Sequence, residues 1–182
     1  MRGDDVVKPN KKRICDYAAL LMHAPHASAL LKGSAAFSEI QGVVQFYRTE
    51  QGIVVAAQIC GLPTSENLCR HPVFGFHIHD GGYCEGDAHD PFSKAMSHYD
   101  PADCAHPYHA GDLPPLFGSG GYAFSVFLTN RFTLSEVIGK AVIIHGNPDD
   151  FTTQPSGNAG IKMACGVIES CKNACRGCND KS

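Results

Sequence analysis

Seven side chains that can bind a metal ion occur in one ordered run, and they limit the chain to folds that can gather them. They are His77, His79, His98, His106, His109, Asp112 and His145, in the segments GFHIHD, SHYDP, AHPYHAGDL and IIHGNPDD. Imidazole binds zinc, copper and nickel, and a carboxylate beside several histidines can complete a closed zinc site. Seven ligands are too many for one tetrahedral ion, so the run predicts two neighbouring metals that share a ligand.

Two of the histidines have the spacing of neighbours on one face of a strand. His77 and His79 lie two residues apart in the apolar segment 74–79, so a strand would project both imidazoles from the same side of a sheet. His145 follows the apolar segment 142–144, which predicts a third ligand at the end of another strand.

The residues His106, His109 and Asp112 are each three apart, which is also the spacing of a helical face. Pro107 lies inside this run and Gly111 near its end, and both disfavour a helix. We therefore predict a loop wrapped around an ion at this place.

Short apolar segments separated by glycine and proline predict an all-β sandwich or barrel. The expected strands are 43–48, 53–59, 74–79, 123–128, 141–144 and 164–168. Gly52 marks a tight connection between the first two, and Thr133–Glu136 has the pattern of a capping box that begins a short helical turn. The segment 80–116 lacks periodicity, so we expect a long loop that a metal and a disulfide keep in order.

The longer motifs resemble those of the copper–zinc superoxide dismutases. The resemblance covers about residues 28–168 and rests on GFHIH (75–79), HYDP (98–101), HAGDLPPL (109–116), VIIHGNPDD (142–150) and SGNAGIKMACGVI (156–168). The LPP after Asp112 and the GGYC after HIHD look more like the bacterial branch than the animal one. The resemblance implies an eight-stranded antiparallel Greek-key β-sandwich or barrel with long metal-binding and active-site loops.

The resemblance also assigns a role to each ligand. It implies copper ligands at His77, His79, His98 and His145, and zinc ligands at His98, His106, His109 and Asp112, so that His98 bridges one copper and one zinc per chain. Asp149 matches the carboxylate that links the two sites in the family. A rigid strand-borne site suits copper, which changes oxidation state, whereas the closed set of three histidines and one aspartate suits a structural zinc.

The implied reaction is the disproportionation of superoxide to oxygen and hydrogen peroxide, with His98 carrying a proton. Lys162 stands where the family has an arginine beside copper, and we count both residues as catalytic. Lysine keeps the charge but loses the planar fork that holds an anion through two bonds, so we expect an active enzyme of reduced rate. The alternative is a copper- and zinc-binding or metal-buffering protein of the same fold with little dismutase activity.

The chain contains nine cysteines. Cys84 and Cys165 match the family's internal disulfide, which would stabilise the fold by about 4–5 kcal/mol in the chain-entropy model. The remaining thiols favour a reducing compartment, so we expect a cytoplasmic protein, with export to the periplasm or the outside of the cell as the alternative. Cys171, Cys175 and Cys178 are expected to belong to a flexible tail with incidental thiols; metal binding by this tail is a weaker hypothesis.

A chain of 182 residues can form one sizeable domain. We expect an N-terminal extension at 1–26 that is poorly ordered, a superoxide dismutase-like domain at 27–169 and a cysteine-rich tail at 170–182. The basic residues 11–13 before the apolar segment 14–22 look like the start of a signal peptide, but Asp16 interrupts that segment, so we favour an extension over a degenerate signal.

A net charge of −3 disfavours nucleic acid as a partner, because phosphate binding requires a concentrated basic face. No apolar run approaches the length of a membrane span, so we expect no membrane partner. Superoxide is the expected substrate. Whether the chain forms a homodimer is left open, since the bacterial and animal branches of the family pair through different faces.

Overall fold

The computed structural model describes residues 19–67, 69 and 72–171, and β-strands dominate its regular structure. The strands are β1 (Ala27–Gly33), β2 (Gln41–Thr49), β3 (Gly52–Cys60), β4 (Val73–Phe74), β5 (Phe76–His79), β6 (Leu116–Phe117), β7 (Ala123–Thr129), β8 (Ala141–His145) and β9 (Lys162–Ser170). Short helical elements are η1 (Ala35–Phe37), η2 (Ser93–Ala95) and α2 (Leu134–Val137).

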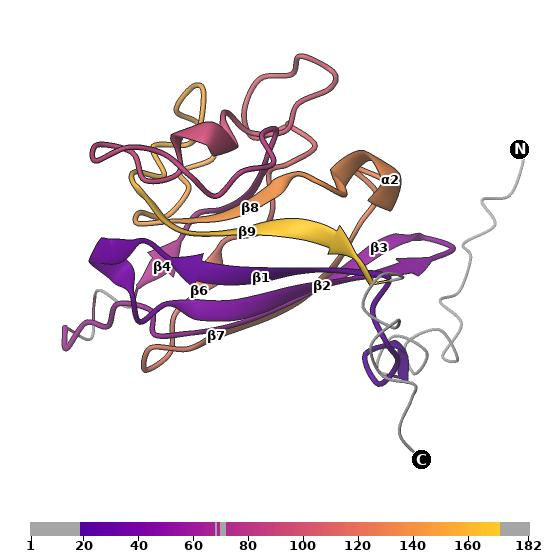
Figure 1. Ribbon diagram of the computed structural model, residues 1–182, viewed down its shortest axis with the longest axis horizontal. Helices are drawn as coiled ribbons and strands as arrows, with labels where there is room; N and C mark the ends of the chain where they lie inside the picture. The colour runs from indigo at the N-terminus through magenta and orange to yellow at the C-terminus, as the bar shows by residue number, and fades with distance from the viewer. Residues whose placement is uncertain (1–18, 68, 70–71, 172–182) are drawn as a thin grey trace, which may run out of the picture.

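The strands form a curled antiparallel sheet that closes into a barrel (Figure 1). Seven strands follow the order β5-β8-β9-β1-β2-β3-β7, and β4 pairs with β6. Only Gly75 separates β4 from β5, and the bridge between Ser119 and Tyr122 turns β6 into β7, so the β4–β6 pair connects the two edges of the sheet. The connections β3–β4 and β7–β8 pass between strands that are not neighbours, which is the Greek-key pattern.

The predicted all-β antiparallel barrel is therefore confirmed. The expected strand number of eight is reached when β4 and β5 are counted as one strand interrupted at Gly75, whose N–H bonds to the Asn147 carbonyl at 2.7 Å. The Thr133–Glu136 capping box begins α2 as expected, and Gly52 ends the tight turn between β2 and β3 with a φ of 138°.

One strand that the sequence did not suggest lies in the middle of the sheet. β1 pairs with β2 on one side and β9 on the other. Its inward residues are Ala27, Ala29 and Leu31. Alanine is depleted in strands, so the local pattern is weak. Backbone pairing on both sides overrides that weak preference.

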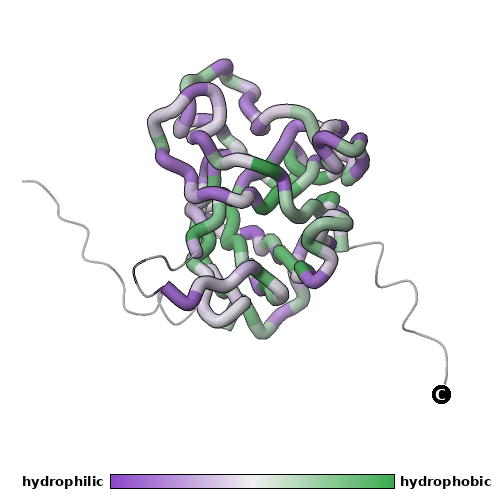
Figure 2. The backbone as a smooth tube through the Cα atoms, turned by 90° about the vertical axis from the view of Figure 1, so that its left-hand side faces the viewer, coloured by the Kyte–Doolittle hydropathy of each residue, from purple (hydrophilic) through white to green (hydrophobic). Residues whose placement is uncertain are grey.

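The inside of the barrel is one apolar cluster. Val44 and Phe46 of β2 point into it, as their alternation predicts, and both are fully buried. On the opposite face of β2, Tyr47 is also buried, because Leu20 and Leu21 pack against it. In Figure 2 the hydrophobic residues concentrate in the strands of the barrel.

Two long loops gather beside β8 and β9, one between β5 and β6 and the other between β8 and β9 (Figure 1). The predicted disulfide between Cys84 and Cys165 is present and ties the first loop to β9, with a Cα–Cα distance of 5.5 Å. Long loops with little secondary structure of their own are uncommon in compact domains, so a covalent anchor of this kind helps to order the loop.

Within the described part of the chain, Cys60, Cys69, Cys104 and Cys171 are free thiols. The Cys171 thiol lies 3.7 Å from the Ser28 hydroxyl, so it contacts the barrel. Residues 1–18 of the expected extension and Cys175 and Cys178 of the expected tail lie outside the described residues. No helix among the residues described is long and apolar enough to cross a bilayer.

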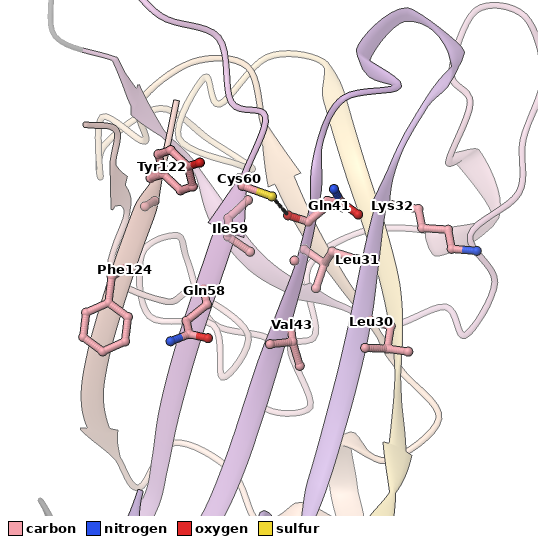
Figure 3. Close-up of a pocket in the computed structure, with 12 residues that line it drawn as sticks. Leu30, Leu31, Lys32, Gln41, Val43, Gln58, Ile59, Cys60, Tyr122 and Phe124 are labelled. Atoms are coloured by element: carbon pink, nitrogen blue, oxygen red, sulfur yellow. Dashed lines mark hydrogen bonds between the residues drawn. The ribbon is translucent and has the colours of Figure 1, made fainter. Parts of the chain in front are cut away.

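An apolar groove lies on the outside of β1, β2, β3 and β7 (Figure 3). Leu30, Tyr122 and Phe124 line it and are largely exposed. None of its lining residues is a predicted metal ligand, so this groove is separate from the predicted site.

Candidate metal centre

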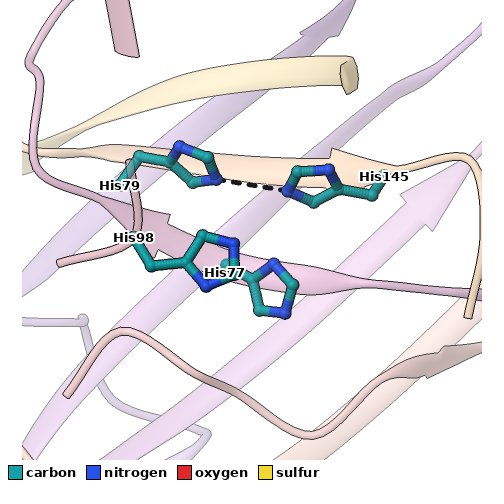
Figure 4. Close-up of side chains that lie close together, drawn as sticks. All are labelled: His77, His79, His98 and His145. Atoms are coloured by element: carbon teal, nitrogen blue, oxygen red, sulfur yellow. Dashed lines mark hydrogen bonds between the residues drawn. The ribbon is translucent and has the colours of Figure 1, made fainter. Parts of the chain in front are cut away.

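Four buried histidines gather where β5 and β8 lie side by side (Figure 4). β5 supplies two of them, β8 ends in the third, and the loop between β5 and β6 supplies the fourth. Their candidate ligand atoms lie within 4.8 Å of one another, so they could hold one metal ion. We call these residues the strand group, which consists of His77, His79, His98 and His145.

Strand pairing positions most of this group. His77 and His79 reach the same side of the sheet because they are two residues apart on β5. The β5–β8 ladder pairs Phe76 with Ile144. The C-terminal end of β8, where His145 lies, is therefore next to the N-terminal end of β5. His98 joins through an isolated antiparallel bridge to His79.

A second set of four buried residues lies in the loop between β5 and β6 and shares His98 with the first. We call it the loop group, which consists of His98, His106, His109 and Asp112. The segment 106–112 forms no helix, as predicted. The structure thus brings together every residue that the sequence analysis placed in the two ligand sets.

Buried imidazole nitrogens without a hydrogen-bond partner occur in both groups. They are His77 Nδ1, His98 Nε2, His106 Nδ1 and His109 Nδ1. A buried polar atom without a partner costs about 1–3 kcal/mol. Neutral imidazole nitrogen is the commonest metal ligand, so these atoms are what a metal site would present. The donor sets therefore fit copper and zinc.

In the loop group the unpaired nitrogens converge on one carboxylate. Asp112 Oδ2 lies 3.1 Å from His106 Nδ1 and 3.2 Å from His109 Nδ1. Asp112 Oδ1 lies 2.8 Å from His98 Nδ1. Burial alone would raise the pKa of Asp112, but the hydrogen bond from His98 and the nearby imidazoles outweigh it and lower the pKa. The carboxylate is therefore ionised, as a zinc ligand must be.

In the strand group, His79 and His145 turn unprotonated nitrogens toward each other. His79 Nδ1 lies 2.8 Å from the Met96 carbonyl, and His145 Nδ1 lies 3.3 Å from the Gly160 carbonyl. A carbonyl only accepts, so each neutral ring carries its hydrogen on Nδ1 and a lone pair on Nε2. The 3.2 Å contact between the two Nε2 atoms, dashed in Figure 4, thus brings two lone pairs together. A cation bound to both atoms would replace this repulsion by two bonds.

Asp149 links the two groups. Its Oδ2 accepts a hydrogen bond from His77 Nε2 at 2.7 Å, and its Oδ1 accepts one from His106 Nε2 at 2.8 Å. Each bond leaves Nδ1 of that ring as a lone pair, which is the tautomer that a metal ligand needs. Burial would raise the pKa of Asp149, but hydrogen bonds from His77, the Phe151 N–H and His106 hold the pKa well below its ordinary value.

Burial also keeps three rings of the strand group neutral. Burial, and then the neighbouring rings of His145 and His98, hold the pKa of His79 well below its ordinary value. Burial, followed by the charge of His77, lowers the pKa of His145 to about 3. Burial is likewise the largest cause of the lowered pKa of His98. Neutral imidazole is the form that binds a metal, so these rings need lose no proton at pH 7.

Arg131, which the sequence analysis missed, holds the backbone of the loop group. Its Nη1 donates to the carbonyls of Pro107, His109 and Asp112 at 2.9, 3.2 and 3.2 Å. A carbonyl occurs at every residue, so no spacing in the sequence marks such a contact. The available hint is an isolated arginine three residues beyond a predicted strand.

Gln154 holds His106 in the same way and was also missed. Its side-chain oxygen accepts from the His106 N–H at 3.0 Å, and its amide donates to the His106 carbonyl at 2.8 Å. The two residues are 48 positions apart, so no local sequence signal connects them.

Lys162 lies beside the strand group but already has partners. It opens β9 and is the register partner of His145. Its Nζ donates to Asp90 Oδ2 at 2.6 Å and to the Phe92 carbonyl at 3.3 Å. The sequence analysis did not anticipate Asp90, because nothing local connects it with β9.

Comparisons with known proteins point to one family. Residues 40–168 match the family model described as copper/zinc superoxide dismutase (SODC). A Cu-Zn superoxide dismutase of Legionella pneumophila is 35% identical over 136 residues, which are 70% of this chain and 77% of the relative. One from Aquifex aeolicus is 31% identical over 145 residues, or 71% of this chain and 80% of the relative.

A third relative extends the match along the chain. The Cu-Zn superoxide dismutase of Photobacterium leiognathi is 29% identical over 179 residues, which are 88% of this chain and 99% of the relative. Among solved structures, a double mutant of a SOD-like protein from Bacillus subtilis has a TM-score of 0.65 and 26% identity. That match covers 80% of this chain and 98% of the other, and it agrees with the barrel described above.

Proposed function

The chain belongs to the copper/zinc superoxide dismutase family, and we propose on that premise which of its residues hold the two metals and carry out the reaction. It is an oxidoreductase that converts superoxide to oxygen and hydrogen peroxide, and copper and zinc are the family's cofactors. The observation that carries the residue assignment is the set of buried, unpartnered imidazole nitrogens distributed over two groups that share His98.

In this proposal the strand group holds copper and the loop group holds zinc. Copper, when bound, supplies the one-electron oxidation and reduction of superoxide, and zinc fixes the shared ligand. The strand group suits the redox metal, because ligands on paired strands move little when the charge of the ion changes. The loop group suits a closed structural ion, because it offers four donors from one loop.

His98 is the proposed proton carrier. Its Nδ1 is held by Asp112 on the loop side, while its Nε2 is buried without a partner among the strand-group rings. A proton can therefore bind at Nε2 without displacing a protein hydrogen bond. Burial lowers the pKa of His98, which favours return of that proton to a substrate oxygen.

Lys162 is the proposed contact for the anionic substrate. It lies opposite His145 in the β8–β9 ladder, and its side chain keeps 15% of its surface exposed. An ammonium attracts a small anion but holds it as a point charge, without the two parallel bonds that an arginine would offer.

The test is to measure metal content and superoxide consumption on protein loaded with one copper and one zinc. We expect two metals per chain and rapid turnover, both of which His145→Gln reduces. A matched control is His89→Gln, which replaces an exposed histidine outside both groups. Two metals with negligible turnover in the unmodified chain would contradict the proposal and support the metal-buffering alternative, which the family membership does not favour.

We also propose a homodimer that forms through the outer side of β7. Phe124, Val126 and Leu128 occupy successive outward positions on this strand and are 67%, 40% and 45% exposed. Adjoining exposed apolar residues of this kind mark interaction sites. Sedimentation equilibrium is expected to give a dimer that Phe124→Lys dissociates. A monomer at all concentrations would reject this assembly.

The proposed cellular compartment remains the cytoplasm, and the domain division remains 1–26, 27–169 and 170–182. The free thiols of Cys60, Cys69, Cys104 and Cys171 support a reducing compartment. The Cys84–Cys165 bond and the bacterial relatives support export instead. Cell fractionation with sequencing of the mature N-terminus distinguishes the two, because export by a cleaved signal would remove the first residues.

A further inference from the structure

Asp90 and Lys162 form an ion pair at the edge of the strand group. The Nζ–Oδ2 distance is 2.6 Å, and the side chains of Lys162 and Asp90 are 15% and 39% exposed. The Phe92 carbonyl accepts a second hydrogen from the ammonium at 3.3 Å. An ammonium has three donor hydrogens, so two of them are engaged. The lysine that stands in the family's arginine position is thus largely satisfied by the protein itself.

The charge of Lys162 still acts on the strand group. Lys162 lies next to His145, a member of that group. The two residues are partners in the β8–β9 ladder, where cross-strand side chains lie close to each other. Any side chain that changes the effective charge of Lys162 therefore changes the electric field at the strand group.

Asp90 is held in place independently of Lys162. Its Oδ1 accepts the Phe92 N–H at 3.0 Å, and its own N–H donates to Asp87 Oδ1 at 3.0 Å. The Asp90 carbonyl accepts the N–H groups of Asp87 and Ser93 at 3.0 and 3.1 Å. These bonds fix the carboxylate within its own loop, so the lysine is drawn to a carboxylate already in position.

The disulfide strengthens this arrangement. It joins Cys84 of the same loop to Cys165, three residues beyond Lys162 on β9. The loop between β5 and β6 is therefore joined to β9 twice, by the disulfide and by the ion pair between Asp90 and Lys162. The separation between Asp90 and Lys162 cannot vary freely while both connections hold.

We propose that Asp90 is a positioning residue that holds the Lys162 ammonium and reduces the positive charge available to small anions at the strand group. This inference rests on the proposed anion-binding role of Lys162. A small anion has to share the ammonium with a carboxylate that is already bound. Removal of the Asp90 charge leaves the ammonium unopposed and frees one of its donors, so anions bind more tightly.

The experiment uses Asp90→Asn in the full chain and azide as the anion probe. With copper and zinc loaded, we expect azide to bind about fivefold more tightly, since partly exposed pairs are worth up to about 1 kcal/mol. The superoxide rate is expected to rise and to fall more steeply with added salt, because more positive charge is exposed to the substrate. In metal-free protein, a small acylating reagent is expected to label Lys162 faster, as read by peptide mass.

Three variants separate positioning from general effects. Glu85→Gln removes one negative charge from the same loop, where Glu85 pairs with Lys94 rather than with Lys162, and should leave azide affinity nearly unchanged. Asp90→Glu should restore tight pairing and weak azide binding. In a Lys162→Met background, Asp90→Asn should have no effect on azide affinity.

The proposal is overturned if Asp90→Asn changes azide affinity no more than Glu85→Gln does. It is also overturned if Asp90→Asn still changes azide affinity in the Lys162→Met background. Failure of the proposed dismutase activity is recognised separately. It would appear as negligible turnover of the unmodified, loaded chain, whereas azide affinity and Lys162 labelling would still decide whether Asp90 restrains the ammonium.

Discussion

The strand group and the loop group use the same kinds of side chain but are held in place by different means. In the strand group, β5 and β8 position three of the four rings through backbone pairing. No loop-group ligand lies in a named strand, and Asp149, Arg131 and Gln154 hold that loop instead. Backbone pairing is largely independent of side-chain identity, so we expect single substitutions to damage the loop group more readily.

The largest effect is expected where the two groups depend on one residue. Asp149→Asn removes the charge that fixes the tautomers of His77 and His106, so the affinities for copper and zinc should both fall by about 100-fold. Competition with a chelator measures both affinities. Asp150→Asn is the matched control, because that neighbouring carboxylate bonds to Thr152 and Thr153 instead. Loss of zinc alone would assign Asp149 to the loop group.

Acid should affect the two groups in different pH ranges. The pKa of His145 is lowered from 6.5 to about 3, so below pH 6.5 the unfolded chain binds a proton that the folded, metal-free protein does not. His145 alone should therefore lower the free energy of unfolding by about 2 kcal/mol between pH 7 and pH 5, and the lowered pKa values of His79 and His98 add to this loss. The lowered pKa of Asp112 adds a loss only as the pH falls below its ordinary value of 3.8.

Urea denaturation of metal-free protein at several pH values measures this dependence. His145→Gln removes one buried imidazole and should reduce the dependence between pH 7 and pH 5 by about 2 kcal/mol, while His79 and His98 keep their share. An unchanged slope in that variant would show that another group binds the proton.

Gly157→Ala should damage the loop group more than the strand group. Gly157 has a φ of 65°, and a Cβ there would touch Asp149 Oδ1 and lie 2.6 Å from His106 Nε2. We expect zinc affinity to fall about tenfold, at the lower end of the effect of disturbing a ligand's hydrogen-bond partner. Gly120→Ala is the control, since Gly120 has a φ of 58° but open space around its Cβ position. Equal effects would attribute the loss to backbone strain.

Arg131→Met should weaken the loop group more mildly. The variant removes the donor to three carbonyls of the loop but keeps most of the apolar side chain. Because Arg131 is exposed, we expect a loss of about fivefold in zinc affinity and little change in copper affinity. Arg48→Met replaces an exposed arginine on β2 as a control. An equal loss of both metals would contradict the separation of the two groups.

The smallest expected effect concerns rate and leaves both metals in place. Lys162→Arg should raise the superoxide rate by about two- to threefold, since a guanidinium can keep its bond to Asp90 and still offer N–H donors to an anion. Stopped-flow consumption of superoxide measures the change. An unaltered rate would indicate that another group holds the anion.

The sequence predicted the strand group better than its surroundings. The two-residue spacing of His77 and His79 places both on one strand face, and the structure has them there. The strand β1 was missed because its alanines and leucines have weak strand preference, although it is paired on both sides. Long-range pairing decides such a strand, and a local pattern does not contain that information.

By itself, the sequence determined the family, the all-β class and which residue types are available to bind two metals, because these depend on ordered motifs and on side-chain chemistry. Only the tertiary structure decided which nitrogen of each ring is left without a partner, that Arg131 and Gln154 hold the loop, and that Asp90 engages Lys162. The physical reason is that hydrogen bonds to backbone carbonyls and ion pairs between distant loops depend on atomic distances. Those distances are set only when the barrel closes and the disulfide draws its loop against β9.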